Sequence, residues 1–318
     1  PMRYNSPTDR DPTPDERNAA WAADRIGQFA EQSDGQPFFL AVGVIRPHTP
    51  LHVPQRFFDM FPKDTLKVPV IMAGDAEDTH YAGVFSPEVK GLKYFQLLKD
   101  SYASLDDGIK AFLQAYLASI AAVDECIGEV VDAVDRAGLA DNTIIVLTSD
   151  HGWNMCEKDY LFKNSLWEES TRVPLVIRAP GVAAKGGIAE HPVSLIDLYP
   201  TLVDLCGLTG KTQKNDKWWP KLEGHSMRPF LADPNSRTWT GPDFALSMIT
   251  AQGAANDPAR QHYSVRTERW RYIRYNNGAE ELYDHANDPY EWTNLAIAPE
   301  HAATLAEMRR RLPDCVPR

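Results

Sequence analysis

Asp150 and His151 form an adjacent pair whose chemistry suits a divalent cation. A carboxylate supplies a hard oxygen ligand and an imidazole supplies a nitrogen ligand. The pair directly follows residues 144–147, an apolar β-branched run that predicts a strand buried on both faces. Ligands in open α/β sheets bind just outside the carboxyl ends of strands. The alternative is structural, with Asp150 capping a turn and His151 hydrogen-bonded within a loop.

A second apolar run, residues 38–44, also predicts a buried strand, and it too is followed by residues that can do chemistry. Arg46 and His48 come next, between prolines that restrict the backbone. An imidazole has an unperturbed pKa of about 6.5, which suits proton transfer near neutral pH. If the two strand ends meet, these side chains share one site with Asp150. The alternative for His48 is a hydrogen-bonded histidine of a proline-rich loop.

The elements that must hold these residues alternate between helix and strand. Thr13 and Glu16 have the spacing of a capping box, which predicts a helix start. Apolar residues over 116–134 recur at helical spacing, and Gly138 is placed to end that helix. Residues 172–178 predict a further strand. A helix, a short turn and a buried strand are typical of an α/β fold with a mainly parallel sheet.

The tail has a different pattern. Residues 269–275 alternate basic and aromatic side chains, and residues 276–278, Asn-Asn-Gly, indicate a hairpin turn. We interpret the alternation as an edge strand with one wet face. The tail therefore predicts a small antiparallel sheet with one helix. A change in composition favours a boundary between a larger α/β domain, 1–235, and a C-terminal α+β subdomain, 236–318.

Composition limits the classes of partner. The net charge of −11 over 318 residues argues against binding to nucleic acid, because no overall excess of cations is available for phosphates. No apolar run is long enough to cross a membrane, and no signal peptide opens the sequence. The cysteines lack metal-site spacing, so we expect buried free thiols. They are Cys126, Cys156, Cys206 and Cys315.

An ordered set of short motifs runs from about residue 37 into the tail. The motifs lie at 149–152, Lys163, 167–178, 180–181, 197–202, 222–227, 265–267, 281–284 and 288–289. As a set they resemble the second half of type I sulfatases, in the alkaline phosphatase superfamily. Residues 38–48 and 150–153 are most similar to the iduronate-2-sulfatase branch.

The resemblance implies an alkaline-phosphatase-like α/β core and hydrolysis of a sulfate monoester with a calcium ion, or Mg²⁺ as the alternative. It implies a sulfated carbohydrate or small sulfate ester as substrate, and a periplasmic or secreted location. The roles that it implies are metal ligation by Asp150 and His151, sulfate contact by Lys163, a place for His48 beside the leaving oxygen or the sulfate, and substrate contacts by Arg46 and Trp153. A divalent cation and a lysine can neutralise charge on a sulfuryl group during transfer.

The sequence also departs from the family pattern. The family nucleophile is a Cys or Ser, in a Cys/Ser-x-Pro/Ala-x-Arg motif, that is oxidised to formylglycine, and none of the cysteines has that context. Ser6 and Arg10 have the right spacing, but Thr8 stands between them. We therefore expect the nucleophile on a missing N-terminal part, and this chain alone to be inactive. The loop after His151 departs from the family pattern as well. Cys156, Lys158 and Asp159 stand where the family has Gly, His and Gly.

Two other functions remain open at this stage. One is a phosphate or phosphonate monoesterase of the same superfamily, although Lys163 and the residues 168–178 favour sulfate. The other is a non-catalytic module that binds sulfated glycans, motivated by the missing nucleophile and by the row Arg269, Arg271 and Arg274. The negative net charge argues against the second.

Overall fold

The computed structural model describes all residues except 1, 3–8, 33–34, 210–222, 255–256 and 317–318. It divides into two compact units. Unit 1 comprises Pro1–Val70 and Gln96–Thr143, and unit 2 comprises Ile71–Phe95 and Ile144–Arg318. Ser6 and Thr8 of the partial nucleophile motif, and the first residue of the 222–227 motif, lie outside the described residues. The domain boundary at residue 235 stays a prediction.

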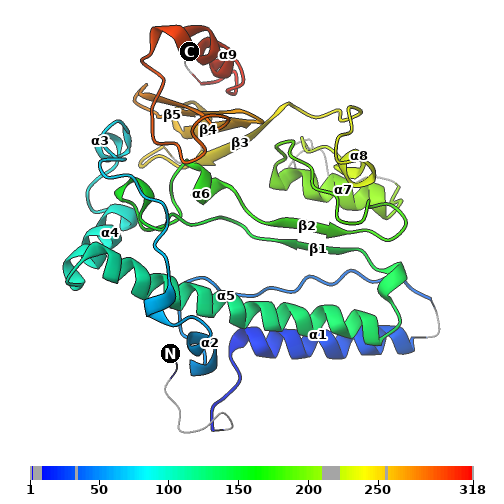
Figure 1. The fold of residues 1–318 in the computed structure, drawn as a ribbon. Coiled ribbons are helices and arrows are strands. Elements are labelled where there is room, and N and C mark those ends of the chain that lie inside the picture. The colour runs from blue at the N-terminus through cyan, green and yellow to red at the C-terminus, as the bar shows by residue number, and fades with distance from the viewer. Residues whose placement is uncertain (1, 3–8, 33–34, 210–222, 255–256, 317–318) are drawn as a thin grey trace. The chain divides into compact units, whose positions relative to one another are not determined.

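Unit 1 is built on helices α1 (Pro14–Glu31) and α5 (Leu105–Arg136), which lie side by side (Figure 1). α1 begins with the predicted capping box, in which Glu16 N donates to Thr13 Oγ1 (3.2 Å) and Thr13 N donates to Glu16 Oε2 (2.6 Å). α5 is followed by Gly138, whose φ of 69° is left-handed and favours glycine. These helix boundaries are confirmed because short-range signals set them.

The strand predicted at residues 38–44 is absent, and this prediction was wrong. Phe39 is 81% exposed, and Phe38 stacks on Phe29 of α1 with ring centroids 4.6 Å apart. A strand needs a neighbour to accept and donate its backbone hydrogen bonds. No described strand pairs with these residues, so their apolar composition is not sufficient to make them one.

In unit 2, β1 (Ile145–Thr148) pairs with β2 (Leu175–Arg178) in a two-stranded sheet. The pairing is antiparallel, with Leu147 opposite Val176, so the parallel pairing expected of the larger sheet does not occur between the described strands. Leu147 is 37% exposed and Val176 59%. The expectation that this strand is buried on both faces was therefore wrong, because the described part of the chain covers neither residue fully.

The tail forms an antiparallel sheet in the order β3 (Phe244–Ile249), β4 (His262–Thr267), β5 (Trp270–Arg274), β6 (Glu280–Asp284). The predicted hairpin turn joins β5 to β6, and Gly278 has a φ of 95°. Helix α9 (Ala302–Arg309) packs on this sheet (Figure 1). The α/β class and the small antiparallel sheet with one helix are confirmed. The edge-strand interpretation was wrong, because β5 lies between two strands and its Tyr272 is fully buried.

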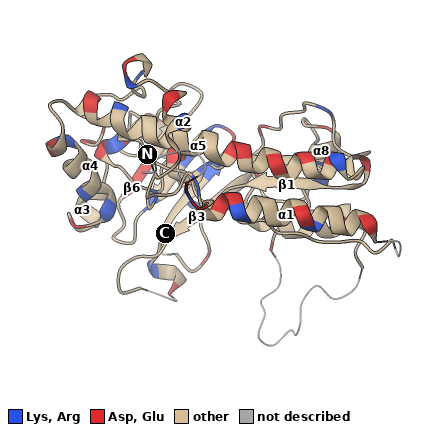
Figure 2. Cartoon of the chain, turned by 90° about the horizontal axis from the view of Figure 1, so that it is seen from below, with Lys and Arg blue, Asp and Glu red and all other residues tan. Residues whose placement is uncertain are grey.

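The remaining helices are α2 (Gln55–Asp59), α3 (Tyr81–Val84), α4 (Lys90–Ser101), α6 (Glu168–Thr171), α7 (Leu198–Leu205) and α8 (Arg228–Ala232). A core of unit 2 contains Tyr160, Trp167 and Tyr283. Among described helices, none has the length and apolar character needed to span a membrane. The cysteines are free, with Cys126 and Cys156 buried and the other two exposed. Figure 2 shows acidic and basic segments on α1, and mainly acidic segments along α5.

Candidate functional site

Asp150 and His151 follow β1 and face one another. His151 Nδ1 lies 2.8 Å from Gly152 O, and a carbonyl can only accept, so Nδ1 carries the ring hydrogen. The other nitrogen, Nε2, lies 3.6 Å from Asp150 Oδ1. Two ligands at right angles on one calcium ion are about 3.4 Å apart when each bond is about 2.4 Å. The arrangement, with a backbone carbonyl orienting the imidazole, therefore fits a divalent cation.

The two side chains differ in exposure. The Asp150 side chain is 86% exposed and that of His151 is 27% exposed. The carboxylate is therefore open to solvent, whereas most of the ring is enclosed by the protein. No hydrogen bond from a described backbone N–H to Asp150 is found, which disfavours the turn-capping alternative for this residue.

The segment that carries Lys163 lies beside the one that carries His151. Asn154 N donates to Phe162 O (2.9 Å), and the rings of Trp153 and Phe162 are 5.4 Å apart. Lys163 Nζ lies 5.9 Å from the centre of the Phe162 ring. The structure thus brings together the segments of three predicted site residues, His151, Trp153 and Lys163.

Two buried tyrosines fix the backbone next to Lys163. The hydroxyl groups of Tyr81 and Tyr160 both donate to Asn164 O, at 2.8 Å and 2.9 Å. Burial raises the pKa of Tyr160 to about 12, so its hydroxyl stays a donor at neutral pH. Both phenols are nearly fully buried. Lys163 therefore extends from a backbone position that side chains of unit 2 define.

A buried ion pair holds the loop between His151 and Lys163. Lys158 Nζ lies 2.6 Å from Asp75 Oδ1 and also donates to Glu291 O, and the side chains of Lys158 and Asp75 are 1% and 3% exposed. Lys158 and Asp159 have φ of 57° and 52°, and Cys156 has φ of 80°. The family resemblance places glycine at two of these three positions, so the ion pair and burial hold a left-handed backbone that glycine adopts without strain.

Arg46 and His48 lie in a turn of unit 1 that a buried carboxylate organises. Asp15, 4% exposed, accepts from Ile45 N (2.7 Å) and Arg46 N (3.0 Å). The Arg46 guanidinium donates to His48 O (3.4 Å) and His52 O (3.3 Å). His48 Nδ1 lies 2.6 Å from Thr49 O, which leaves Nε2 as the nitrogen that can accept a proton. Because this turn and Asp150 belong to different units, their convergence stays a prediction.

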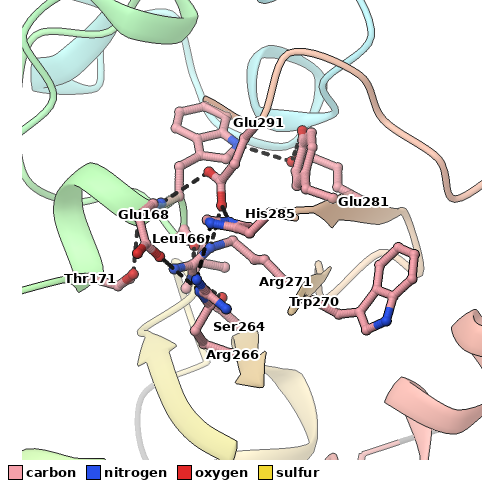
Figure 3. Close-up of polar contacts among 12 residues, drawn as sticks. Leu166, Glu168, Thr171, Ser264, Arg266, Trp270, Arg271, Glu281, His285 and Glu291 are labelled. Atoms are coloured by element: carbon pink, nitrogen blue, oxygen red, sulfur yellow. Dashed lines mark hydrogen bonds and ion pairs between the residues drawn. The ribbon is translucent and has the colours of Figure 1, made fainter. Parts of the chain in front are cut away.

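A second group of ligand-type residues, absent from the sequence prediction, lies between α6 and the C-terminal sheet. One ligand atom from each of Glu168, His285 and Glu291 lies within 4.8 Å of the others. Arg271 pairs with both Glu168 and Glu291, and Arg266 pairs with Glu168 (Figure 3). Partial burial raises the pKa of Glu168, but the two guanidinium groups outweigh this and lower its pKa to about 2. The group is a network of ion pairs, in which arginines bind the carboxylates that would otherwise be free to ligate a cation.

His285 completes this network through both of its ring nitrogens. Its Nδ1 lies 3.1 Å from an Nη2 of Arg266, which can only donate, so Nδ1 accepts. Its Nε2 lies 2.8 Å from Glu291 Oε1 and donates to it. Arg266 and Arg271 stand in strand-like segments of the sequence, but the basic-aromatic alternation at residues 269–275 predicts a wet face and so does not reveal a buried network. Arg271 is only 1% exposed.

Comparison with solved structures places the fold. A phosphonate monoester hydrolase from Silicibacter pomeroyi is 26% identical, with a TM-score of 0.74 over 92% of this chain and 58% of that one. A protein solved with its substrate D-glucosamine-2-N,6-O-disulfate is 22% identical, with a TM-score of 0.71 over 93% of this chain and 68% of that one. The described residues therefore have an alkaline-phosphatase-like α/β fold.

Comparison of sequences places the family. The sulfatase family model matches residues 2–208, and the model of the C-terminal region of N-sulphoglucosamine sulphohydrolase matches residues 156–316. A sulfatase from Formosa agariphila is 32% identical over 303 residues, which are 94% of this chain and 53% of the relative. The chain belongs to the sulfatase family. It spans about half the length of the curated relatives that it matches across most of its length.

Proposed function

We propose that this chain is the later part of a sulfuric ester hydrolase that acts on a sulfated sugar or a related sulfate monoester. The supporting observation is the Asp150–His151 pair, with Nε2 turned to the carboxylate, in a chain of the sulfatase family. We also propose that the nucleophile, a residue converted to formylglycine, lies on a part of the protein outside this chain. In support, none of the four cysteines stands in a Cys-x-Pro/Ala-x-Arg context.

Asp150 and His151 would hold a calcium ion, with Mg²⁺ as the alternative. When bound, the ion supplies positive charge to the sulfuryl oxygens. Lys163 adds a second positive charge to the sulfate, and its backbone is fixed by Tyr81 and Tyr160. Because the missing part would supply further carboxylates, this chain alone is expected to bind the ion weakly.

His48 would protonate the leaving oxygen from Nε2, since Nδ1 is bound to Thr49 O. Arg46 and Trp153 would contact the substrate beyond the sulfate. We propose a substrate of the iduronate-2-sulfatase kind, a sulfated sugar. The support is the resemblance of residues 38–48 and 150–153 to that branch.

The test is turnover of 4-nitrophenyl sulfate. The isolated chain is expected to be inactive, the protein with its N-terminal part active, and Asp150→Asn in that longer protein at least about 100-fold slower. Asp141→Asn, an exposed aspartate outside the site, is the matched control and should retain activity. Turnover by the isolated chain would contradict the proposal for the nucleophile.

A substrate panel on the longer protein separates sulfate from phosphate chemistry. Lys163 and the motif at residues 168–178 favour sulfate esters. The similarity to a phosphonate monoester hydrolase makes phosphate and phosphonate esters the necessary comparison. A wide preference for either of these over sulfate would replace the sulfatase proposal with a monoesterase of the same superfamily.

A further inference from the structure

The residues that follow His151 are bound to helix α6 by backbone hydrogen bonds. Gly152 N donates to Ser170 O (2.8 Å), and Trp153 N donates to Glu169 O (2.6 Å). The contact is so close that a Cβ on Gly152 would lie 2.1 Å from Glu169 O. Any shift of α6 therefore moves the backbone next to the Asp150–His151 pair.

Helix α6 cannot hold its own position. It has four residues and no side-chain cap, and a helix this short has no stability in isolation. Its first residue, Glu168, is bound instead by the C-terminal sheet and by Glu291, which follows that sheet. Glu168 N donates to Glu291 Oε2 (3.0 Å), and Glu168 Oε2 accepts from Arg266 Nε (3.1 Å) and from Arg271 Nη2.

Arg271 is the residue that joins these groups. Its side chain is 2% exposed, and its guanidinium reaches in several directions (Figure 3). Nε lies 2.5 Å from Glu291 Oε1, Nη1 donates to Leu166 O (3.0 Å) and to Ser264 Oγ (2.7 Å), and Nη2 donates to Glu168. A lysine ammonium is a single point charge and cannot span all of these acceptors.

Glu291, which binds both Arg271 and Glu168 N, has a strained backbone. Its φ is 58°, a left-handed backbone that disfavours side chains other than glycine, yet its side chain is 3% exposed. Ion pairing with Arg271 and hydrogen bonds from His285 Nε2 and Glu168 N hold the carboxylate there. Strained residues of this kind persist only where their surroundings determine them fully.

We propose that Arg271 is a positioning residue for the cation-binding pair Asp150 and His151, and that it acts through Glu168 and the backbone of α6. This inference rests on the proposed function of the pair. It assigns to the C-terminal sheet a role in holding the metal-binding end of β1. Loss of residues that orient metal ligands weakens metal binding by about 10- to 100-fold.

The test uses the longer protein and has two readouts. The first is hydrogen exchange at the Gly152 and Trp153 amides, which we expect to be at least about tenfold faster in Arg271→Met. The second is Ca²⁺ affinity by calorimetry at a temperature where each variant is folded, expected to be about tenfold weaker in Arg271→Met and also reduced in Arg271→Lys. Arg309→Met breaks an arginine–glutamate pair of the same sheet that does not touch α6, and should change neither readout.

The outcomes are distinguishable. Unchanged amide exchange and unchanged affinity in folded Arg271→Met would overturn the proposal. If Arg271→Met does not fold, Glu291→Gln replaces it, because glutamine keeps an oxygen acceptor for Glu168 N. Amide exchange is again expected to be faster and Ca²⁺ affinity weaker. Asp150→Asn is measured in parallel, because Ca²⁺ binding that survives this change contradicts the proposed function. The amide exchange then still tests the role of Arg271.

Discussion

At the scale of single residues, Glu157 in the loop after His151 has a pKa that the fold raises. Burial raises the pKa of this carboxyl to about 7, although Glu157 Oε2 accepts a hydrogen bond from Met155 N (2.5 Å). The folded protein therefore favours the protonated form more than the unfolded chain does. The carboxylate costs stability at neutral pH, within the loop that leads to Lys163.

Glu157→Gln should stabilise the protein at high pH only. The folded pKa lies above the value of 4.5 in the unfolded chain, so the cost is absent below about pH 4.5, grows up to about pH 7 and is constant above it. At about 1.4 kcal/mol per pKa unit, the gain at pH 8 is at most about 3.5 kcal/mol. Urea unfolding at pH 4 and pH 8 checks this, and an equal gain at both pH values would show that the carboxyl is not responsible.

At the scale of elements, the loop between β1 and α6 depends on charges brought from elsewhere in unit 2. Lys158 pairs with Asp75, and Lys158 N also donates to Asp75 Oδ2 (3.1 Å). Burial raises the pKa of Asp75, against the lowering effect of the Lys158 ammonium. Such a pair adds little stability compared with apolar residues in the same place. Removing one partner is nevertheless strongly destabilising, because the other charge is left buried and unpaired.

Lys158→Met should destabilise the protein by about 3–5 kcal/mol, because it leaves the Asp75 carboxylate buried without a cation. Asp75→Asn added to Lys158→Met should recover most of the loss, since the amide oxygen can still accept from the backbone N–H of residue 158. The measurement is a double-mutant cycle by denaturant unfolding. Additive losses in the double variant would mean that the two side chains do not act as a pair.

At the scale of the whole molecule, the arginines of the tail do not form a basic surface. Arg269 pairs with Asp284 (2.6 Å), Arg271 is buried against Glu168 and Glu291, and Arg274 donates to Gly278 O. The chain carries a net charge of −11. Both observations argue against the alternative of a module that binds sulfated glycans through this row.

The isolated chain should therefore pass through a heparin column at moderate salt, because these three arginines bind groups of the chain itself and the negative net charge repels polyanions. Chromatography at two salt concentrations checks this. The variant Arg269→Ser with Arg274→Ser is the control. Retention of the chain that is lost in the variant would restore the glycan-binding alternative.

The sequence by itself determined the features that depend on neighbouring residues. Thr13 and Glu16 fixed the start of α1, Gly138 the end of α5, and the Asn-Asn-Gly turn the β5–β6 hairpin. The order of the motifs indicated the sulfatase family, and the residue types at 150 and 151 predict a cation site, which stays a prediction. These signals are local because caps, turns and ligand types are decided within a few positions.

Only the tertiary structure decided which strands pair and where charges are buried. Residues 38–44 and β5 have apolar or alternating patterns that do not reveal whether a neighbouring strand exists. Arg271 and Glu168 are 103 residues apart, and Lys158 and Asp75 are 83 apart. A charged residue is expected at the surface until a distant partner offsets its desolvation. The sequence therefore indicated Asp150 and His151 as candidates, and only the structure showed that the segment after them is hydrogen-bonded to α6 and that α6 is bound by distant arginines.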